Sequence, residues 1–251
     1  MAVARFAVIR FPGTNCERET VRVLREVLEQ SVDEPLWHAD PRPLDEYDCV
    51  ILPGGFAHGD HLRAGAIARF SAIMADVERY AARGGLVLGI CNGFQVLLEA
   101  GLLPGAMLRN ATLQFRGAWV HCRVERTDSP FTAACQPGQV LRLPIAHGEG
   151  SYAVAGPEDL ERLERAGAVL LRYSDPAGAV TAAANPNGSL GNIAGITNPR
   201  GNVFGLMPHP ERACESLLGS VDGMPLLRSI VQHVTTERGE ASVTRELSPA
   251  C

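Results

Sequence analysis

Short apolar runs alternate with helical patterns through the first hundred residues of the chain. Residues 4–11, 48–52 and 86–90 read as buried strands. Residues 17–30 and 67–82 carry apolar side chains at helical spacing and therefore read as helices. Repeated strand-to-helix steps are typical of a doubly wound, mostly parallel sheet with flanking helices. We therefore predict an α/β fold, whose ligands bind at the carboxyl ends of the strands.

The second half of the chain has a different pattern, which predicts mostly β structure. Short apolar runs between turns rich in Pro, Gly and Asn indicate strands at residues 119–125, 140–145, 168–173, 192–197 and 203–207. A short helix is expected at residues 157–166 and a closing helix at residues 223–234. We predict one domain over residues 1–234. The tail, residues 235–251, has little to bury, and we expect it to be mobile.

Composition narrows the class of protein. The 251 residues are 46% hydrophobic and 20% charged, as in ordinary globular proteins. A net charge of −5 argues against a nucleic-acid partner, and no apolar run is long enough for a membrane span. Arg5 and Arg10 interrupt the N-terminal apolar run, so we expect a strand there rather than a secretory leader. Seven cysteines without a C-x-x-C pair indicate neither zinc nor disulfides, and predict a reducing, cytoplasmic setting.

Cys91 lies where a predicted strand turns into a predicted helix. Glycine stands two residues before it and two residues after it, in the segment GICNG. Such an elbow crowds strand against helix, so Gly89 and Gly93 occupy positions where a Cβ would be in the way. The turn directs the sulfur out of the sheet edge, over a helix N-terminus that stabilises negative charge. This is a nucleophile's position, although most intracellular cysteines are buried apolar thiols.

A second candidate element is the pair His209 and Glu211 in the segment PHPER. The two are two residues apart, so on an extended backbone their side chains point to the same side. A carboxylate beside an imidazole fixes its tautomer and raises its basicity, as in a nucleophile, base and orienter triad. The alternative for an isolated His-x-Glu is a solvated surface pair. The flanking prolines and the preceding apolar strand favour the functional interpretation.

A third element is the loop PGGF at residues 53–56. Attack on a carbonyl creates a negative oxygen, which two backbone N–H groups usually receive. One donor in an elbow is the residue after the nucleophile, here Asn92, and Gly55 is the candidate for the other. The alternative is that Gly54 and Gly55 only make a tight turn. Cys16 also follows a strand, but it lacks the flanking glycines, so we interpret it as a structural residue near the site.

Together these three elements resemble the class I, triad-type glutamine amidotransferases, a family with a flavodoxin-like fold. Longer segments are similar to the glutaminase-subunit branch of that family, which serves phosphoribosylformylglycinamidine synthase in de novo purine synthesis. The similar segments extend over nearly the whole chain up to Val234. They are FPGTNCERE (11–19), PGGFAHGDHLRAGAIA (53–68), GICNGFQVL (89–97), RNATLQF (109–115), AHGEG (146–150), NPNGS (185–189) and NIAGITNPRGNVFGLMPHPER (192–212).

The resemblance implies that this chain hydrolyses glutamine to glutamate and ammonia through a thioester. Cys91 would attack the side-chain amide, with His209 as the base and Glu211 as its orienter. Gly55 and Asn92 would form the oxyanion hole. Gln95 matches the family's glutamine-binding residue, and Asn110 and Phe115 are expected to contact the amino-acid end of the substrate. No metal site is expected.

The resemblance also implies a larger, ATP-dependent synthetase subunit that receives the ammonia and converts formylglycinamide ribonucleotide to formylglycinamidine ribonucleotide. A small accessory subunit is left open. The chain lacks a P-loop motif, so we expect ATP and Mg²⁺ on the partner and no cofactor in this chain. His147 and Glu149, in a glycine-flanked loop, are candidates for the contact with the synthetase.

Three other functions remain as alternatives. A peptidase or hydrolase of the cysteine-elbow superfamily often has its histidine directly after the cysteine, where this chain has Asn92. A folate-polyglutamate hydrolase would share the triad, but usually in a secreted setting. A non-catalytic binding subunit would not need all three triad residues, and a redox sensor would leave the His-Pro-Glu and Gly-Gly segments unexplained.

Overall fold

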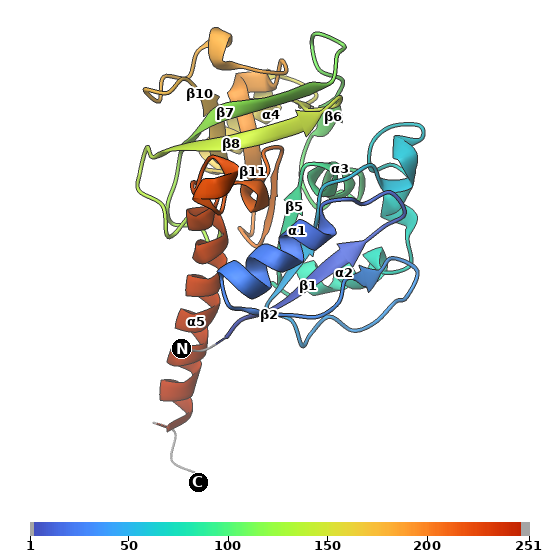
Figure 1. Ribbon diagram of the computed structural model, residues 1–251, viewed down its shortest axis with the longest axis vertical. Coiled ribbons are helices and arrows are strands. Elements are labelled where there is room, and N and C mark those ends of the chain that lie inside the picture. Colours follow the sequence, from blue (N-terminus) through green and yellow to red (C-terminus); the bar gives the residue numbers. More distant parts are fainter. Residues whose placement is uncertain (1–2, 247–251) are drawn as a thin grey trace.

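A ten-stranded sheet forms the centre of the computed structural model, which describes residues 3–246, and the side chains of residues 3–239 (Figure 1). Its strand order is β2-β1-β4-β5-β12-β11-β10-β7-β8, and β3 pairs with β1 beside that path. β1 to β5 and β12 pair in parallel, whereas β12, β11, β10, β7 and β8 pair antiparallel to one another. The predicted α/β fold, with a mostly parallel first part and a β-rich second half, is confirmed.

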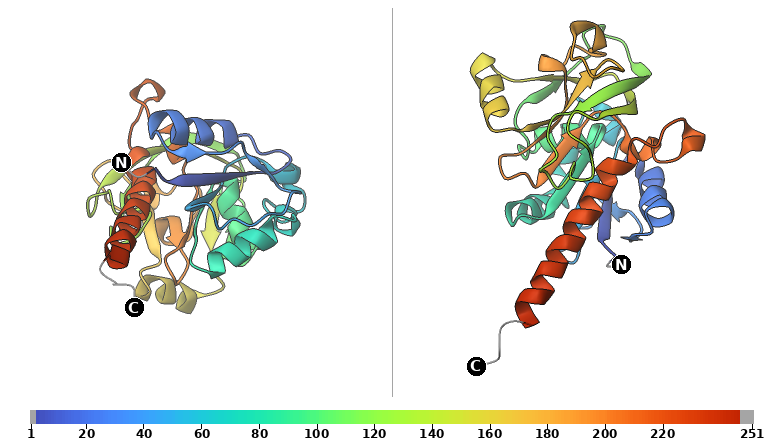
Figure 2. Two further views of the ribbon diagram at one scale, coloured as in Figure 1. Left: turned by 90° about the horizontal axis from the view of Figure 1, so that it is seen from below. Right: turned by 90° about the vertical axis from the view of Figure 1, so that its left-hand side faces the viewer.

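The parallel part is built from the first hundred residues. Its strands are β1 (Arg5–Arg10), β2 (Ser31–Val32), β3 (Leu36–Trp37), β4 (Cys49–Leu52) and β5 (Leu86–Ile90). Its helices are α1 (Glu17–Arg22), α2 (Met74–Ala82) and α3 (Asn92–Glu99). α1 continues into a π-helical turn at Val23–Val27. α1 covers one face of the sheet, and α2 and α3 cover the other (Figure 2).

The antiparallel part contains the remaining strands and two helices. Its sheet strands are β7 (Arg116–Val124), β8 (Val140–His147), β10 (Val169–Ser174), β11 (Ile193–Thr197) and β12 (Val203–Leu206). β6 (Ala106–Leu108) and β9 (Ser151–Ala153) form a separate two-stranded ribbon. The helices are α4 (Pro157–Arg165) and α5 (Met224–Glu246). Short 3₁₀ turns lie at Ala57–Asp60, Ala68–Phe70, Ala182–Ala184, Leu190–Asn192, Pro210–Arg212 and Ser216–Leu218.

Two predicted helices differ from the structure. The helix expected at residues 67–82 is a 3₁₀ turn at Ala68–Phe70 followed by α2 from Met74, because the backbone becomes extended at Ser71. The closing helix does not stop at Val234 but continues to Glu246, projecting from the body (Figures 1 and 2). Its added turns include Arg238, which is bonded to the Asp48 carboxylate and the Val3 carbonyl. Residues 247–251 lie outside the described residues, and the mobility of the tail stays a prediction.

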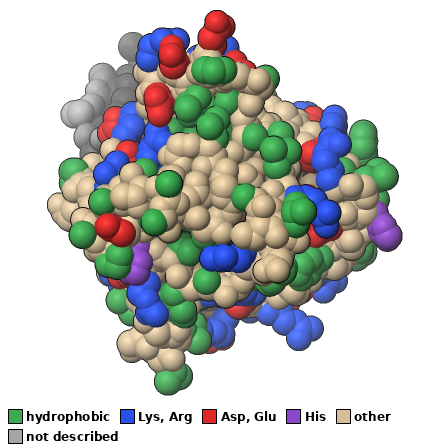
Figure 3. Space-filling model, turned by 90° about the horizontal axis from the view of Figure 1, so that it is seen from above, with side chains coloured by type: hydrophobic (Ala, Val, Ile, Leu, Met, Phe, Trp, Pro, Cys, Tyr) green, Lys and Arg blue, Asp and Glu red, His purple; other side chains and the backbone are tan. Residues whose placement is uncertain are grey.

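The surface is consistent with the charge of the sequence. On the face shown in Figure 3, basic, acidic and hydrophobic side chains are interspersed rather than gathered into a basic stripe. Among residues 3–246, no helix combines the length and apolar character that crossing a membrane requires.

The close approach of α3 to the sheet depends on two glycines in neighbouring strands. Gly89 of β5 and Gly205 of β12 are direct partners in the parallel register. A Cβ on Gly89 would lie 2.5 Å from Leu97 Cδ1, and one on Gly205 would lie 2.7 Å from Leu103 Cδ1 and clash with Phe94. These side chains are buried in the core, so α3 packs directly on the backbone of both strands.

We expect Gly205→Ala to lower the free energy of unfolding by about 1–3 kcal/mol, because the new methyl group enters a fully packed core. Chemical denaturation followed by circular dichroism measures the change. Gly117→Ala in β7 is the matched control, since a Cβ there meets no atom within 4 Å. Equal stabilities of the two variants would show that the glycine pair does not limit packing.

Candidate active site

Loops that carry the candidate residues meet at one edge of the sheet. β1, β4, β5 and β12 are parallel, so the segments that follow them emerge at the same edge. The antiparallel alternation from β12 through β11, β10 and β7 brings the carboxyl end of β8 to this edge as well. This topology brings five chain segments, distant in sequence, around Cys91.

Cys91 has the geometry of a nucleophile elbow. It lies between the last residue of β5 and the first of α3, with φ of 50° and ψ of −104°, a region that non-glycine residues rarely occupy. A Cβ on Gly93 would clash with the Leu52 carbonyl, and one on Gly89 with Gly93 itself. The predicted role of both glycines is therefore confirmed by the packing. The Cys91 sulfur lies 3.7 Å from the Ala146 carbonyl oxygen.

His209 and Glu211 form a buried pair directly after β12. His209 Nδ1 lies 2.6 Å from Glu211 Oε1, and both side chains are 2% exposed or less. His209 Nε2 has no hydrogen-bond partner among the described residues, so this nitrogen is available for proton transfer. Burial alone would lower the pKa of His209, but the Glu211 carboxylate and the Cys91 and Cys16 sulfurs raise it well above its ordinary value. The imidazolium form is thus favoured beside Cys91.

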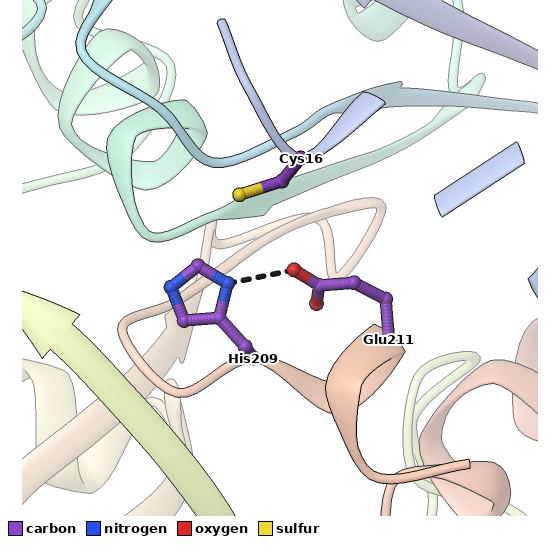
Figure 4. A group of neighbouring side chains, drawn as sticks. All are labelled: Cys16, His209 and Glu211. Carbon is purple, nitrogen blue, oxygen red and sulfur yellow. Dashed lines mark hydrogen bonds and ion pairs between the residues drawn. The ribbon is translucent and has the colours of Figure 1, made fainter. Parts of the chain in front are cut away.

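The sulfur of Cys16 lies close to the His209 imidazole and the Glu211 carboxylate (Figure 4). Its sulfur accepts a hydrogen bond from Arg212 at 3.1 Å, and Arg212 also pairs with Glu19. Burial raises the pKa of the Cys16 thiol. Ligand atoms of Cys16, His209 and Glu211 lie within 4.8 Å of one another, but the neighbouring guanidinium makes this cluster a poor site for a cation. These contacts place Cys16 beside the pair, in the position that the sequence predicted.

The loop after β4 contains a backbone conformation that only glycine accommodates easily. Gly55 has φ of 152°, and a Cβ there would lie 2.6 Å from Thr14 Cα. The loop is tied by the Asn15 and Cys16 amides donating to the Gly54 carbonyl and by Phe56 donating to Gly13. These bonds do not use the Gly55 N–H. A Cβ on Gly54 would lie 2.7 Å from His209 Cε1, so the imidazole packs against the loop.

A pocket of about 270 Å³ opens beside the sulfur of Cys91. Its wall combines backbone, apolar side chains and charged groups from the loops described above. It is lined by Gly55, Phe56, Asp60, Cys91, Gln95, Arg109, Leu113, Phe115, Ala146, His147, Gly148 and Glu149. Cys91 therefore lines the pocket together with charged side chains of both signs.

The predicted binding residues differ in position. Gln95 lines the pocket, and its amide donates to the Glu149 carbonyl at 2.6 Å. Phe115 also lines the pocket, 56% exposed, with its ring 6.5 Å from that of Phe56. Asn110 does not line it. Its buried amide donates to the carbonyls of Gln114 and His147 and accepts from Gly150, so it braces the pocket wall.

Besides Asn110, the position of His147 differs from the expectation, and two charged residues of the pocket wall were missed. His147, a candidate for the contact with the synthetase, is only 3% exposed and lines the pocket from within. Its Nδ1 lies 3.0 Å from Asn110 Oδ1, and burial lowers its pKa to about 4. Asp60 and Arg109 line the pocket without having been singled out. Both lie in segments that are similar to the amidotransferase family, at residues 53–68 and 109–115. A charged side chain in such a segment could have indicated a contact with the substrate.

Comparison with known proteins agrees with this site. Residues 3–224 match the family described as the CobB/CobQ-like glutamine amidotransferase domain. The chain is 58% identical to the phosphoribosylformylglycinamidine synthase subunit PurQ of Moorella thermoacetica over 94% of this chain and 98% of that protein. The PurQ of Symbiobacterium thermophilum is 56% identical over 92% of this chain and 97% of its own length.

Solved structures show the same relationship. The structure of PurLQS from Thermotoga maritima superposes with a TM-score of 0.81 and 41% identity, covering 93% of this chain and 100% of that chain. A putative GMP synthase subunit from Thermoplasma acidophilum, 15% identical with a TM-score of 0.63, shares the fold. The chain belongs to the glutamine amidotransferase family, in the group of the PurQ subunits of phosphoribosylformylglycinamidine synthase.

Proposed function

We propose that this chain is the glutaminase subunit of a phosphoribosylformylglycinamidine synthase, which hydrolyses glutamine and supplies ammonia to a synthetase subunit. The observation that carries the proposal is the strained elbow of Cys91 beside the buried His209 and Glu211 pair. This combination meets the requirements for acyl transfer through a thioester. The relatives named PurQ, identical at more than half of the aligned positions, support the assignment to purine biosynthesis.

The reaction begins when the Cys91 sulfur attacks the side-chain amide carbon of glutamine. The raised pKa of His209 favours a thiolate and imidazolium pair, in which the thiol proton already lies on Nε2. His209 delivers this proton to the departing nitrogen, while Glu211 holds Nδ1 and stabilises the imidazolium. The backbone N–H groups of Gly55 and Asn92 receive the negative charge on the carbonyl oxygen. Ammonia leaves as the thioester forms. Water, activated by the same imidazole, then releases glutamate and restores the thiol.

The ammonia needs a partner subunit, because it would be protonated and lost in water. We infer that this partner is the larger, ATP-dependent synthetase subunit, which converts formylglycinamide ribonucleotide to formylglycinamidine ribonucleotide. The relative of known structure carries the name PurLQS, which supports this and leaves room for a small third subunit. We place ATP and Mg²⁺ on the synthetase, since this chain has no P-loop motif.

We expect a glutamine-mimicking chloroketone to alkylate Cys91, and excess glutamine to protect it. Cys16 will not react, because it does not line the pocket as Cys91 does and its thiol has a raised pKa. Mass spectrometry of the digested protein, with and without the synthetase subunit, identifies the modified peptide. Cys16→Ala should keep the labelling, and Cys91→Ala should lose both labelling and ammonia release. Labelling that glutamine does not slow would argue against the assignment.

Replacing Glu211 by Gln should lower kcat for glutamine hydrolysis by a factor on the order of 10²–10⁴, because the imidazole loses the carboxylate that orients it and stabilises its charge. Steady-state ammonia release in the presence of the synthetase subunit measures this. Glu19→Gln is the matched control, since Glu19 pairs with Arg212 and not with His209. A loss of similar size in both variants would mean that Glu211 acts only through packing.

The Gly55→Ala variant should lose roughly a hundredfold to a thousandfold in kcat, the usual cost of removing one oxyanion-hole donor. The alanine cannot keep φ near 152° without contacting Thr14, so the N–H turns out of position. Glutamine hydrolysis and thermal unfolding are both measured, because a variant that is partly unfolded would also lose activity. An active, normally folded Gly55→Ala enzyme would remove Gly55 from the oxyanion hole.

A further inference from the structure

The pocket beside Cys91 has an acidic side formed by two carboxylates from different loops. Asp60 ends the 3₁₀ turn after β4, and Glu149 lies in the loop between β8 and β9. Both line the same pocket as Cys91 and Gln95. The mechanism above uses neither of them, since the triad supplies the nucleophile, the base and its orienter.

Each carboxylate is held by one oxygen only. Asn92 Nδ2 donates to Asp60 Oδ1 at 3.1 Å, and the Ala64 amide donates to Glu149 Oε2 at 3.2 Å. Within the described residues, the second oxygen of each group has no hydrogen-bond partner. Asn92 Nδ2 also donates to Gln95 Oε1, whose amide donates to the Glu149 backbone. A chain of hydrogen bonds through Asn92 and Gln95 therefore links the Asp60 carboxylate to the backbone of Glu149.

No arginine among the described residues makes a hydrogen bond to either carboxylate, although Arg63 and Glu149 attract each other at longer range. Arg63 is the arginine next to Asp60 in sequence, but its guanidinium makes two hydrogen bonds to Glu99. Burial and the charge of Glu149 raise the pKa of Asp60 to about 6. Asp60 is therefore ionised at neutral pH at an energetic cost, which a cation entering the pocket would offset. The other charged side chain of the wall is Arg109, which is exposed.

We propose that Asp60 and Glu149 bind the α-ammonium group of the substrate and so restrict the enzyme to amides of α-amino acids. The inference rests on the proposed function, because glutamine carries its ammonium and carboxylate groups at the end opposite to the amide that Cys91 attacks. The acidic wall receives the ammonium group, and Arg109 is left as a partner for the α-carboxylate. Charge-assisted hydrogen bonds of this kind contribute more than neutral ones.

The test compares glutamine with glutaramate, which has the same side-chain amide and carboxylate but no amino group. Ammonia release is measured for both substrates with the chain in complex with its synthetase subunit. We expect the wild-type complex to prefer glutamine strongly in kcat/KM. Asp60→Asn and Glu149→Gln should each lower kcat/KM for glutamine by roughly 10- to 100-fold, mainly through KM, and leave glutaramate nearly unchanged.

The comparison of the two substrates shows whether Asp60 and Glu149 bind the ammonium group or only support the structure of the pocket. Asp40→Asn, which removes an exposed carboxylate away from the pocket, should behave as wild type. Equal losses for both substrates in Asp60→Asn and Glu149→Gln, or a wild-type enzyme that does not discriminate, would overturn the inference while leaving the glutaminase assignment intact. A wild-type complex that hydrolyses neither amide would overturn the proposed function itself, and this inference with it.

Discussion

The packing of α3 on the glycine pair Gly89 and Gly205 is the constraint on which the active site depends. Without side chains at these positions, the helix rests on the backbone of β5 and β12. The chain must then turn sharply between β5 and α3, and Cys91 takes the strained conformation that directs its sulfur outward. The parallel register that pairs Gly205 with Gly89 also pairs Leu206 with Ile90, so the segments leading to His209 and Cys91 leave the sheet side by side.

The charged side chains of this site form two groups, one buried in the interior and one lining the pocket. His209 and Glu211 are almost fully buried, where an unpaired charge would be very unfavourable, and they support each other through the bond from Nδ1 to Oε1. Asp60 and Glu149 lie in the open pocket and face a space that a substrate can enter. The first pair therefore satisfies its charges within the protein, whereas the proposed role of the second pair requires a cationic group in the pocket.

Much of the site could be predicted because its chemistry depends on short, local patterns. The glycines around Cys91 and the two-residue spacing of His209 and Glu211 carry their geometry in the sequence itself. Asp60 and the buried position of His147 could not be derived in this way, because they depend on how loops after β4 and β8 fold over one another. The end of α5 was also set by a distant contact, since Arg238 reaches Asp48 and Val3.

The position of β12 has a consequence for how the enzyme is made. β12 is among the last strands of the chain, yet it lies in the interior of the sheet, between β5 and β11. During synthesis, Cys91 is made early, and nearly half of the chain separates it from His209. Insertion of this strand joins the two parts of the sheet and brings the segment of His209 and Glu211 to the edge where Cys91 lies. A chain arrested before residue 203 has Cys91 but neither His209 nor Glu211, and we therefore expect it to release no ammonia.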